Sequence, residues 1–184
     1  FQPKILWNES FHYTGYLRWQ SPKNDSCINK IKDFCDGKKV PILTFGSVTF
    51  ERSRKIMSRF LKSWPNGKKI IIQSGWAQLS IERKNNYVLS VDRISHDQLF
   101  HYASVVIHHG GAGTTASVLH AGKPHIIIPH IGDQNFFAKE IKRLGVGFSI
   151  RLKRWPEILP RAVRKIERSK RKQNKALKIA KILS

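Results

Sequence analysis

The sequence predicts an α/β domain with a Rossmann-like parallel sheet and helices on both of its faces. Short, uninterrupted apolar runs such as VPILTF (40–45) and SVVIHH (104–109) alternate with segments of helical spacing. Glycine or proline ends most of these runs. A chain of 184 residues that is 40% hydrophobic can bury one sizeable core. We therefore expect a single folded α/β core.

The predicted elements begin with a strand over 40–46. Ile56, Phe60 and Trp64 then recur every four residues, as on one face of a helix over 51–64. The remaining elements are expected in the order strand 68–74, strand 86–92, helix 95–102, strand 104–109, helix 114–120, strand 123–130 and helix 134–144. Because parallel strands end at one edge of the sheet, the loops after them are expected to form the binding site.

The charge is strongly positive. The 34 Lys and Arg residues against 12 Asp and Glu give +22, which attracts nucleic acid, anionic lipid or phosphorylated ligands. Basic residues are densest between Arg161 and Lys181, where Glu167 is the only acidic residue. A solvated helix face is the simplest interpretation. Apolar residues at helical spacing also fit an interfacial helix on anionic lipid, or a helix that packs on a preceding domain; these are Ala176, Leu177, Ala180 and Leu183.

Cysteine content and hydropathy limit the cellular compartments that we expect for this protein. Cys27 and Cys35 have no further Cys or His nearby, so neither a zinc site nor a disulfide framework is indicated. No apolar run approaches the roughly 18–20 residues of a membrane span. We expect a cytoplasmic protein, and peripheral contact with an anionic membrane is left open. The chain begins at Phe1 rather than Met, so we also expect a longer protein upstream.

A glycine-rich loop follows the predicted strand 104–109. Gly110, Gly111 and Gly113 lead directly into a helix, whose unsatisfied N–H groups and dipole favour phosphate oxygens. Thr114 and Thr115 can cap the helix or donate to the same anion. The loop has neither the P-loop lysine nor the G-x-G-x-x-G spacing, so a plain tight turn is the alternative.

Two further features make a ligand site more specific. His109 can hydrogen-bond a phosphate oxygen at neutral pH, whereas His108 has the opposite strand parity and is expected to pack. Asp133 and Gln134 follow the next strand and can bind vicinal hydroxyls, as in sugar sites; the alternative is that Asp133 caps the following helix. Phosphate and sugar groups on adjacent loops indicate a nucleotide sugar.

These residues carry a family resemblance. The stretch 91–147, with its pattern HHGGAGTT…P…GDQ, closely resembles the donor-binding domain of GT-B glycosyltransferases of family 1. The resemblance is strongest to the sterol and lipid glucosyltransferase branch and its bacterial antibiotic-modifying relatives. HYTGYLRW (12–19) and VPILTFGSVTF (40–50) resemble that branch's interdomain segment and the first strand of its second domain. The resemblance implies the C-terminal half of a GT-B fold.

The resemblance also implies a set of site residues. The donor pyrophosphate would be held largely by backbone N–H groups of His109, Gly111, Ala112, Gly113 and Thr114. The remaining matches are Asp133 and Gln134 for the sugar hydroxyls, Ser47 for the phosphate and the backbone around Ile94 for the uracil edge, with Trp76 and Arg93 as candidate base contacts.

Two departures from the family pattern affect base stacking and the proton acceptor. Arg93 stands where plant members stack the base on tryptophan, and Trp76 is the candidate replacement. The family's general base is a histidine of an N-terminal domain that this chain lacks, so we expect no catalytic residue here. The other histidines are expected to be structural or on the surface: His12, His101, His120 and His125.

The implied organisation has three parts. Residues 1–38 are expected to be an interdomain linker or wrapping segment, 39–168 the nucleotide-sugar donor domain, and 169–184 a basic C-terminal helix or tail. The implied enzyme transfers a hexose, glucose by expectation, from UDP-sugar to a hydroxyl of a sterol-like, lipid or other small hydrophobic acceptor, with inversion and without cofactor or metal. The chain alone is expected to bind donor without turning it over.

Two alternatives to this predicted function stay open. The chain could be a natural donor-binding subunit that pairs with a separate membrane-associated acceptor subunit. It could also be a non-enzymatic basic module that binds nucleic acid or anionic lipid. Nucleic acid is disfavoured because aromatic residues do not interleave with the basic runs.

Overall fold

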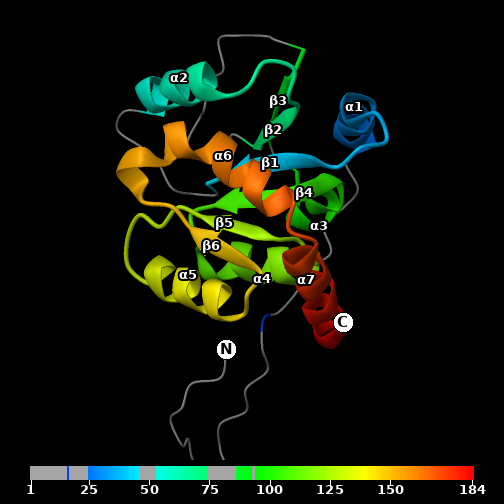
Figure 1. Ribbon diagram of the computed structural model, residues 1–184. Coiled ribbons are helices and arrows are strands. Elements are labelled where there is room, and N and C mark those ends of the chain that lie inside the picture. Colours follow the sequence, from blue (N-terminus) through cyan, green and yellow to red (C-terminus); the bar gives the residue numbers. More distant parts are fainter. Residues whose placement is uncertain (1–15, 17–24, 46–52, 74–85, 93) are drawn as a thin grey trace, which may run out of the picture.

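The fold is a six-stranded parallel sheet with helices on both faces (Figure 1). The computed structural model describes residues 16, 25–45, 53–73, 86–92 and 94–184. The strand order is β3-β2-β1-β4-β5-β6. The bounds are β1 Val40–Thr44, β2 Ile70–Gln73, β3 Val88–Val91, β4 Ala103–His108, β5 His125–Ile127 and β6 Gly147–Ser149. The predicted Rossmann-like class is confirmed, and the order reverses between β1 and β4, where such sheets bind ligands.

Helices cover the two faces unequally. Their bounds are α1 Asp25–Cys35, α2 Ser53–Ser63, α3 His96–Leu99, α4 Ala112–His120, α5 Gln134–Arg143, α6 Trp155–Glu167 and α7 Lys170–Leu183, with 3-10 turns at Phe100–Tyr102 and Leu152–Arg154. Helices α2 and α6 pack on one face, whereas α1, α3, α4 and α5 pack on the other. Figure 1 shows α6 in front of the sheet and α4 behind it. Helix α7 packs against α4 and α6.

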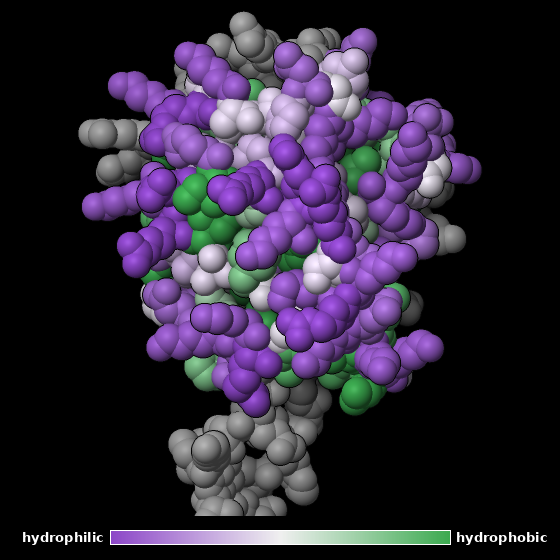
Figure 2. Space-filling model, in the orientation of Figure 1, coloured by the Kyte–Doolittle hydropathy of each residue, from purple (hydrophilic) through white to green (hydrophobic). Residues whose placement is uncertain are grey.

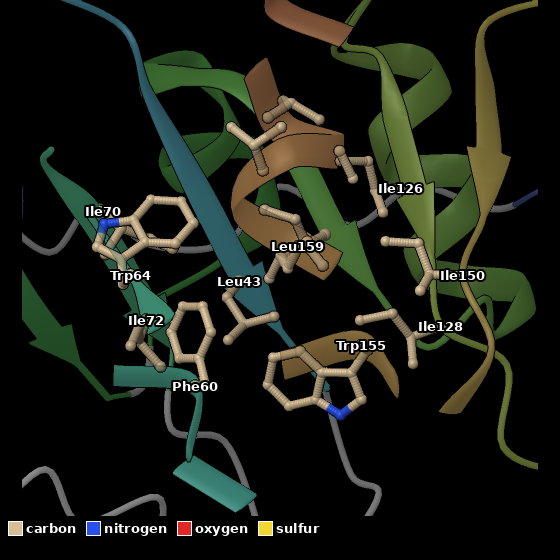
Figure 3. Close-up of a cluster of buried hydrophobic side chains, with 14 of the residues drawn as sticks. Leu43, Phe60, Trp64, Ile70, Ile72, Ile126, Ile128, Ile150, Trp155 and Leu159 are labelled. Carbon is tan, nitrogen blue, oxygen red and sulfur yellow. The ribbon is translucent and has the colours of Figure 1, made fainter. Parts of the chain in front are cut away.

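Both faces of the central strands are buried, which explains the uninterrupted apolar runs. Along β1, Leu43 faces the α2 and α6 side while Ile42 faces the α1 side, as the period of two requires. Figure 3 shows Leu43 beside the aromatic rings of Phe60 and Trp155. Those two ring centroids are 5.3 Å apart. Burial of these large side chains supplies the main stabilisation of this face.

Helix α6 tolerates a proline because α2 supplies the missing donor. Pro160 has no N–H for the carbonyl of Pro156 one turn earlier. The hydroxyl of Ser63 donates to this carbonyl at 2.5 Å. The proline therefore leaves no buried acceptor unpaired and couples α6 to α2.

The end of α6 lies at the amino edge of the sheet, opposite to the edge where the strands end. Glu167 accepts a hydrogen bond from Lys68 Nζ at 2.5 Å and from Ser104 Oγ at 2.8 Å. Lys68 precedes β2, and Ser104 lies near the beginning of β4. One carboxylate thus joins α6 to two strands.

We expect Glu167→Gln to lower the free energy of unfolding by about 1 kcal/mol, because an amide cannot accept both bonds. The matched control is Glu157→Gln, which breaks the exposed ion pair with Arg59 and should have a smaller effect. Urea denaturation of both variants measures the difference. Equal losses would contradict the role assigned to Glu167.

Three parts of the fold differ from the sequence-based expectations. Helix α1 forms inside the segment expected to be a linker, and its Ile31 and Cys35 are buried against the sheet. Strand β6 was not expected. Helix α4 begins at Ala112, two residues before the predicted start. The domain limits at 38 and 168 stay predictions. None of the helices in the described part of the chain combines the length and apolar composition needed to cross a bilayer.

Candidate functional site

The candidate site lies where β4 passes into α4, at the point where the strand order reverses. The carboxyl end of β4 is His108, which is paired with Thr44 at the end of β1. A three-residue loop then leads to α4, whose N-cap residue is Gly111. The prediction that the glycine loop lies at this sheet edge is therefore confirmed.

The beginning of α4 presents backbone donors. The carbonyl of Gly111 accepts from the N–H of Thr115 at 2.9 Å, which is the first hydrogen bond of the helix. The N–H groups of Ala112, Gly113 and Thr114 precede this bond, so helix geometry gives them no acceptor within the helix. They also lie at the positive end of the helix dipole. Such an array binds phosphate or carboxylate oxygens.

Two of the loop glycines are required by their surroundings. Gly110 has φ +95°, and a Cβ there would lie 2.7 Å from Ile127 Cγ2. A Cβ on Gly111 would lie 2.4 Å from Nε2 of His109. A Cβ on Gly113 would meet no atom within 4 Å. The loop therefore packs tightly against β5 and the His109 ring, while the first turn of α4 is open at Gly113.

His109 lies beside these donors and is largely buried. Burial lowers its pKa, and the carboxylate of Asp133 opposes this shift. The ring is therefore neutral at pH 7 and can donate one N–H. Its Nδ1 is buried without a hydrogen-bond partner among the described residues. That nitrogen is closed to solvent, so a hydrogen bond to a ligand oxygen would come from Nε2, which lies beside Gly111.

Asp133 and Gln134 lie at the beginning of α5. Gln134 Oε1 accepts from the N–H of His130 at 2.7 Å and of Ile131 at 3.2 Å. Its carbonyl thus holds the loop after β5, and its NH₂ group is the end that can donate to a sugar hydroxyl. Asp133 is exposed and makes no side-chain capping bond to α5. The capping alternative for its carboxylate is therefore wrong.

The backbone of Ile94 has protein partners. Its N–H donates to the carbonyl of Asp92 at 2.9 Å, and its carbonyl accepts from Nε2 of Gln73 at 2.7 Å. Gln73 ends β2 and is buried. A base at this position would use the second lone pair of the Ile94 carbonyl. Sequence reasoning missed Gln73 because this contact joins the end of β2 to a residue 21 positions later, beyond β3.

Three of the predicted site residues lie outside the part of the chain that the structure describes. Ser47, Trp76 and Arg93 lie outside the described residues, and their predicted roles stay predictions. Within the described ranges, no group of three or more His, Cys, Asp or Glu side chains is arranged to hold a metal ion. His125, expected to be structural or on the surface, is fully buried.

A doubly wound parallel sheet with the beginning of a helix at its switch point defines the α/β class that binds ligands at the carboxyl edge. Residues 69–182 match the family described as "Erythromycin biosynthesis protein CIII-like, C-terminal domain". The chain belongs to this family of glycosyltransferase C-terminal domains, which confirms the resemblance drawn from the sequence.

Relatives and solved structures agree with this assignment. Sterol 3-beta-glucosyltransferase of Vanderwaltozyma polyspora is 29% identical over 98% of this chain, which spans 16% of that relative. The calicheamicin glycosyltransferase CalG4 superposes with a TM-score of 0.75 at 18% identity, over 97% of this chain and 45% of its own. The glycosyltransferase VinC, solved in complex with DTDP, gives 0.65 at 19% identity over 79% and 37%. These two structures support the fold alone.

Proposed function

We propose that this chain binds the UDP-sugar donor of a two-domain glycosyltransferase. The observation that carries the proposal is the row of N–H donors at Ala112, Gly113 and Thr114 beside a neutral His109, with Asp133 on the adjacent loop. Charge on Asp133 contributes to the pKa of His109, so the two loops share one electrostatic environment. Diphosphate and sugar would thus bind side by side.

The proposed reaction transfers a hexose, glucose in the first instance, to a hydroxyl of a sterol-like or other hydrophobic acceptor, with inversion. As the glycosidic bond breaks, negative charge grows on the departing diphosphate. The N–H donors of α4 and the N–H of His109 would stabilise that charge, which makes a divalent metal unnecessary. A base from the preceding domain would accept the proton of the acceptor hydroxyl.

The named relatives support the substrate classes. The relative from Vanderwaltozyma polyspora is, by its name, a glucosyltransferase that acts on the 3-beta position of sterols. VinC, which shares the fold, was solved in complex with DTDP, a nucleoside diphosphate, so this fold can hold that class of ligand. Because this chain spans a small part of that relative, we assign the acceptor to residues outside it. Pairing with a separate acceptor subunit would leave the donor chemistry unchanged.

The test is calorimetric titration of this chain with UDP and UDP-glucose, without metal. His109→Ala should weaken both ligands about tenfold or more, since a hydrogen bond to a charged oxygen is lost. Asp133→Ala should weaken UDP-glucose while leaving UDP nearly unchanged. Glu157→Gln is the matched control, because its ion pair with Arg59 is exposed. Equal affinity of wild type and His109→Ala for UDP would contradict the proposal.

One observation favours a second function, binding of an anionic surface. The Lys and Arg side chains of α6 and α7 are largely exposed, and Figure 2 shows hydrophilic side chains over the face that these helices cover. Exposed apolar side chains lie among those of α7: Leu177, Ile182 and Leu183. The end of α6 lies at the amino edge of the sheet. Such a contact would not compete with the donor for the same residues.

A further inference from the structure

Beneath the glycine loop lie two buried histidines that the proposed function does not use. His108 ends β4, and His125 begins β5. Both are fully buried. The parallel register sets Val106 opposite His125, and the two imidazoles meet across the strands. Nε2 of His108 lies 3.1 Å from Nδ1 of His125.

The loop itself determines which nitrogen of His108 carries the proton. The backbone N–H of Gly110 donates to Nδ1 of His108 at 3.2 Å. An amide N–H is only a donor, so this Nδ1 is unprotonated and accepts. Burial and the neighbouring histidines keep the pKa of His108 well below its usual value, so the ring is neutral. Its single proton is therefore on Nε2.

The same reasoning determines which nitrogen of His125 carries its proton. Because Nε2–H of His108 donates, Nδ1 of His125 must accept, and the proton of His125 is on its Nε2. That Nε2 is buried and has no hydrogen-bond partner in the described part of the chain. A buried donor is thus left unsatisfied on His125 while the bond to His108 is kept. The described residues thus give His108 a partner on each ring nitrogen and His125 a partner on one.

We propose that His108, whose Nδ1 accepts from Gly110 while its Nε2–H donates to His125, is a positioning residue that fixes the Gly110 N–H and thereby aims the α4 donors at the diphosphate. The inference rests on the proposed function. Gly110 is the position at which the loop turns, since its φ is +95° and Ile127 of β5 and Gln134 of α5 leave no room for a side chain. The histidine pair holds Gly110 through the hydrogen bond to His108 and is not among the residues proposed to contact the ligand.

Two conservative substitutions of His108 separate its two contacts. In His108→Asn, Oδ1 stands where Nδ1 stood, so the Gly110 N–H keeps an acceptor while the contact with His125 is lost. In His108→Gln, the terminal amide can reach His125, but no acceptor remains beside Gly110. We expect His108→Asn to bind UDP within about threefold of wild type and His108→Gln to bind about tenfold or more weakly.

The tautomer has its own spectroscopic signature. Nitrogen-15 spectra of the imidazole rings should show His108 and His125 protonated on Nε2 and not on Nδ1 between pH 6.5 and 8. In His125→Leu, the His108 proton loses its acceptor, and affinity for UDP should fall although the altered side chain lies below the loop. Thermal unfolding of each variant shows that the comparison is made on folded protein.

Each result bears on one claim. If wild type fails to bind UDP, the proposed function fails, and the nitrogen spectra still test the pair. If wild type binds and His108→Gln binds as tightly, the positioning role is overturned. Protonation of His108 on Nδ1 would overturn it as well. Equal weakening in His108→Asn and His108→Gln would reduce the pair to core packing and also contradict the inference.

Discussion

Gly110→Ala is expected to destabilise the protein by about 3 kcal/mol or more. Two costs combine, because a non-glycine residue at φ +95° is strained and the new Cβ would lie 2.7 Å from Ile127 Cγ2 and 3.2 Å from the Gln134 carbonyl. The carbonyl belongs to the backbone of α5 and cannot rotate away. Urea denaturation followed by circular dichroism measures the loss.

The chain offers a matched control for this prediction three positions further along, just past the loop. Gly113 lies in the first turn of α4, and a Cβ there meets nothing within 4 Å. Gly113→Ala should therefore leave stability equal or slightly raised, because alanine is the better helix former. It should still weaken UDP binding if the diphosphate approaches the backbone there. Similar stability of the two variants would contradict the described packing of the loop.

Acid is expected to destabilise the fold by several kcal/mol between pH 6.5 and 4.5. Burial lowers the pKa of His125 to about 3 and that of His130 to about 4, and it holds the pKa of His108 well below its usual value. The unfolded chain binds these protons below about pH 6.5, whereas the folded chain does not. Stability is therefore full above that pH and is lost as pH falls, at up to about 1.4 kcal/mol per pH unit for each buried histidine.

The measurement is the free energy of unfolding at half-unit pH steps. His125→Gln should reduce the steepness by about one proton over this range, because one titrating group is removed. His101→Gln is the matched control, since His101 is exposed; burial and Lys39 lower its pKa too, so this variant should reduce the steepness by less than His125→Gln. A stability that is flat from pH 6.5 to 4.5 would contradict the neutral, buried state of the pair.

The sequence was informative where local pattern and structure coincide. Apolar runs predicted the central strands because both of their faces are buried, as Ile42 and Leu43 show. Glycines after a strand and before a helix predicted the loop between β4 and α4, since both features are local. Helix α1 was missed although Ile28, Ile31 and Cys35 recur at helical spacing, because turn-forming residues such as SPKND (21–25) directly precede them. Strand β6, with three residues, shows no alternation at all.

Contacts between distant segments could not be predicted in this way. The strand alternation predicted that His108 packs in the interior, and this is confirmed because the side chain is fully buried. Its hydrogen bond from the Gly110 N–H could not be predicted, because it depends on the turn of the loop. Its meeting with His125 depends on the register of β4 and β5. The bond from Gln73 to Ile94 joins the end of β2 to the segment that follows β3. Each of these contacts depends on how distant segments are placed relative to one another, which the sequence of a single segment does not reveal.

The central claim is that the beginning of α4 binds the donor diphosphate. Its most direct test is the amide NMR spectrum of this chain during titration with UDP in the absence of metal. We predict that the largest shifts fall on the N–H groups of Ala112, Gly113 and Thr114, followed by the ring of His109. Shifts confined to the basic residues of α6 and α7, with those four residues unmoved, would contradict the claim.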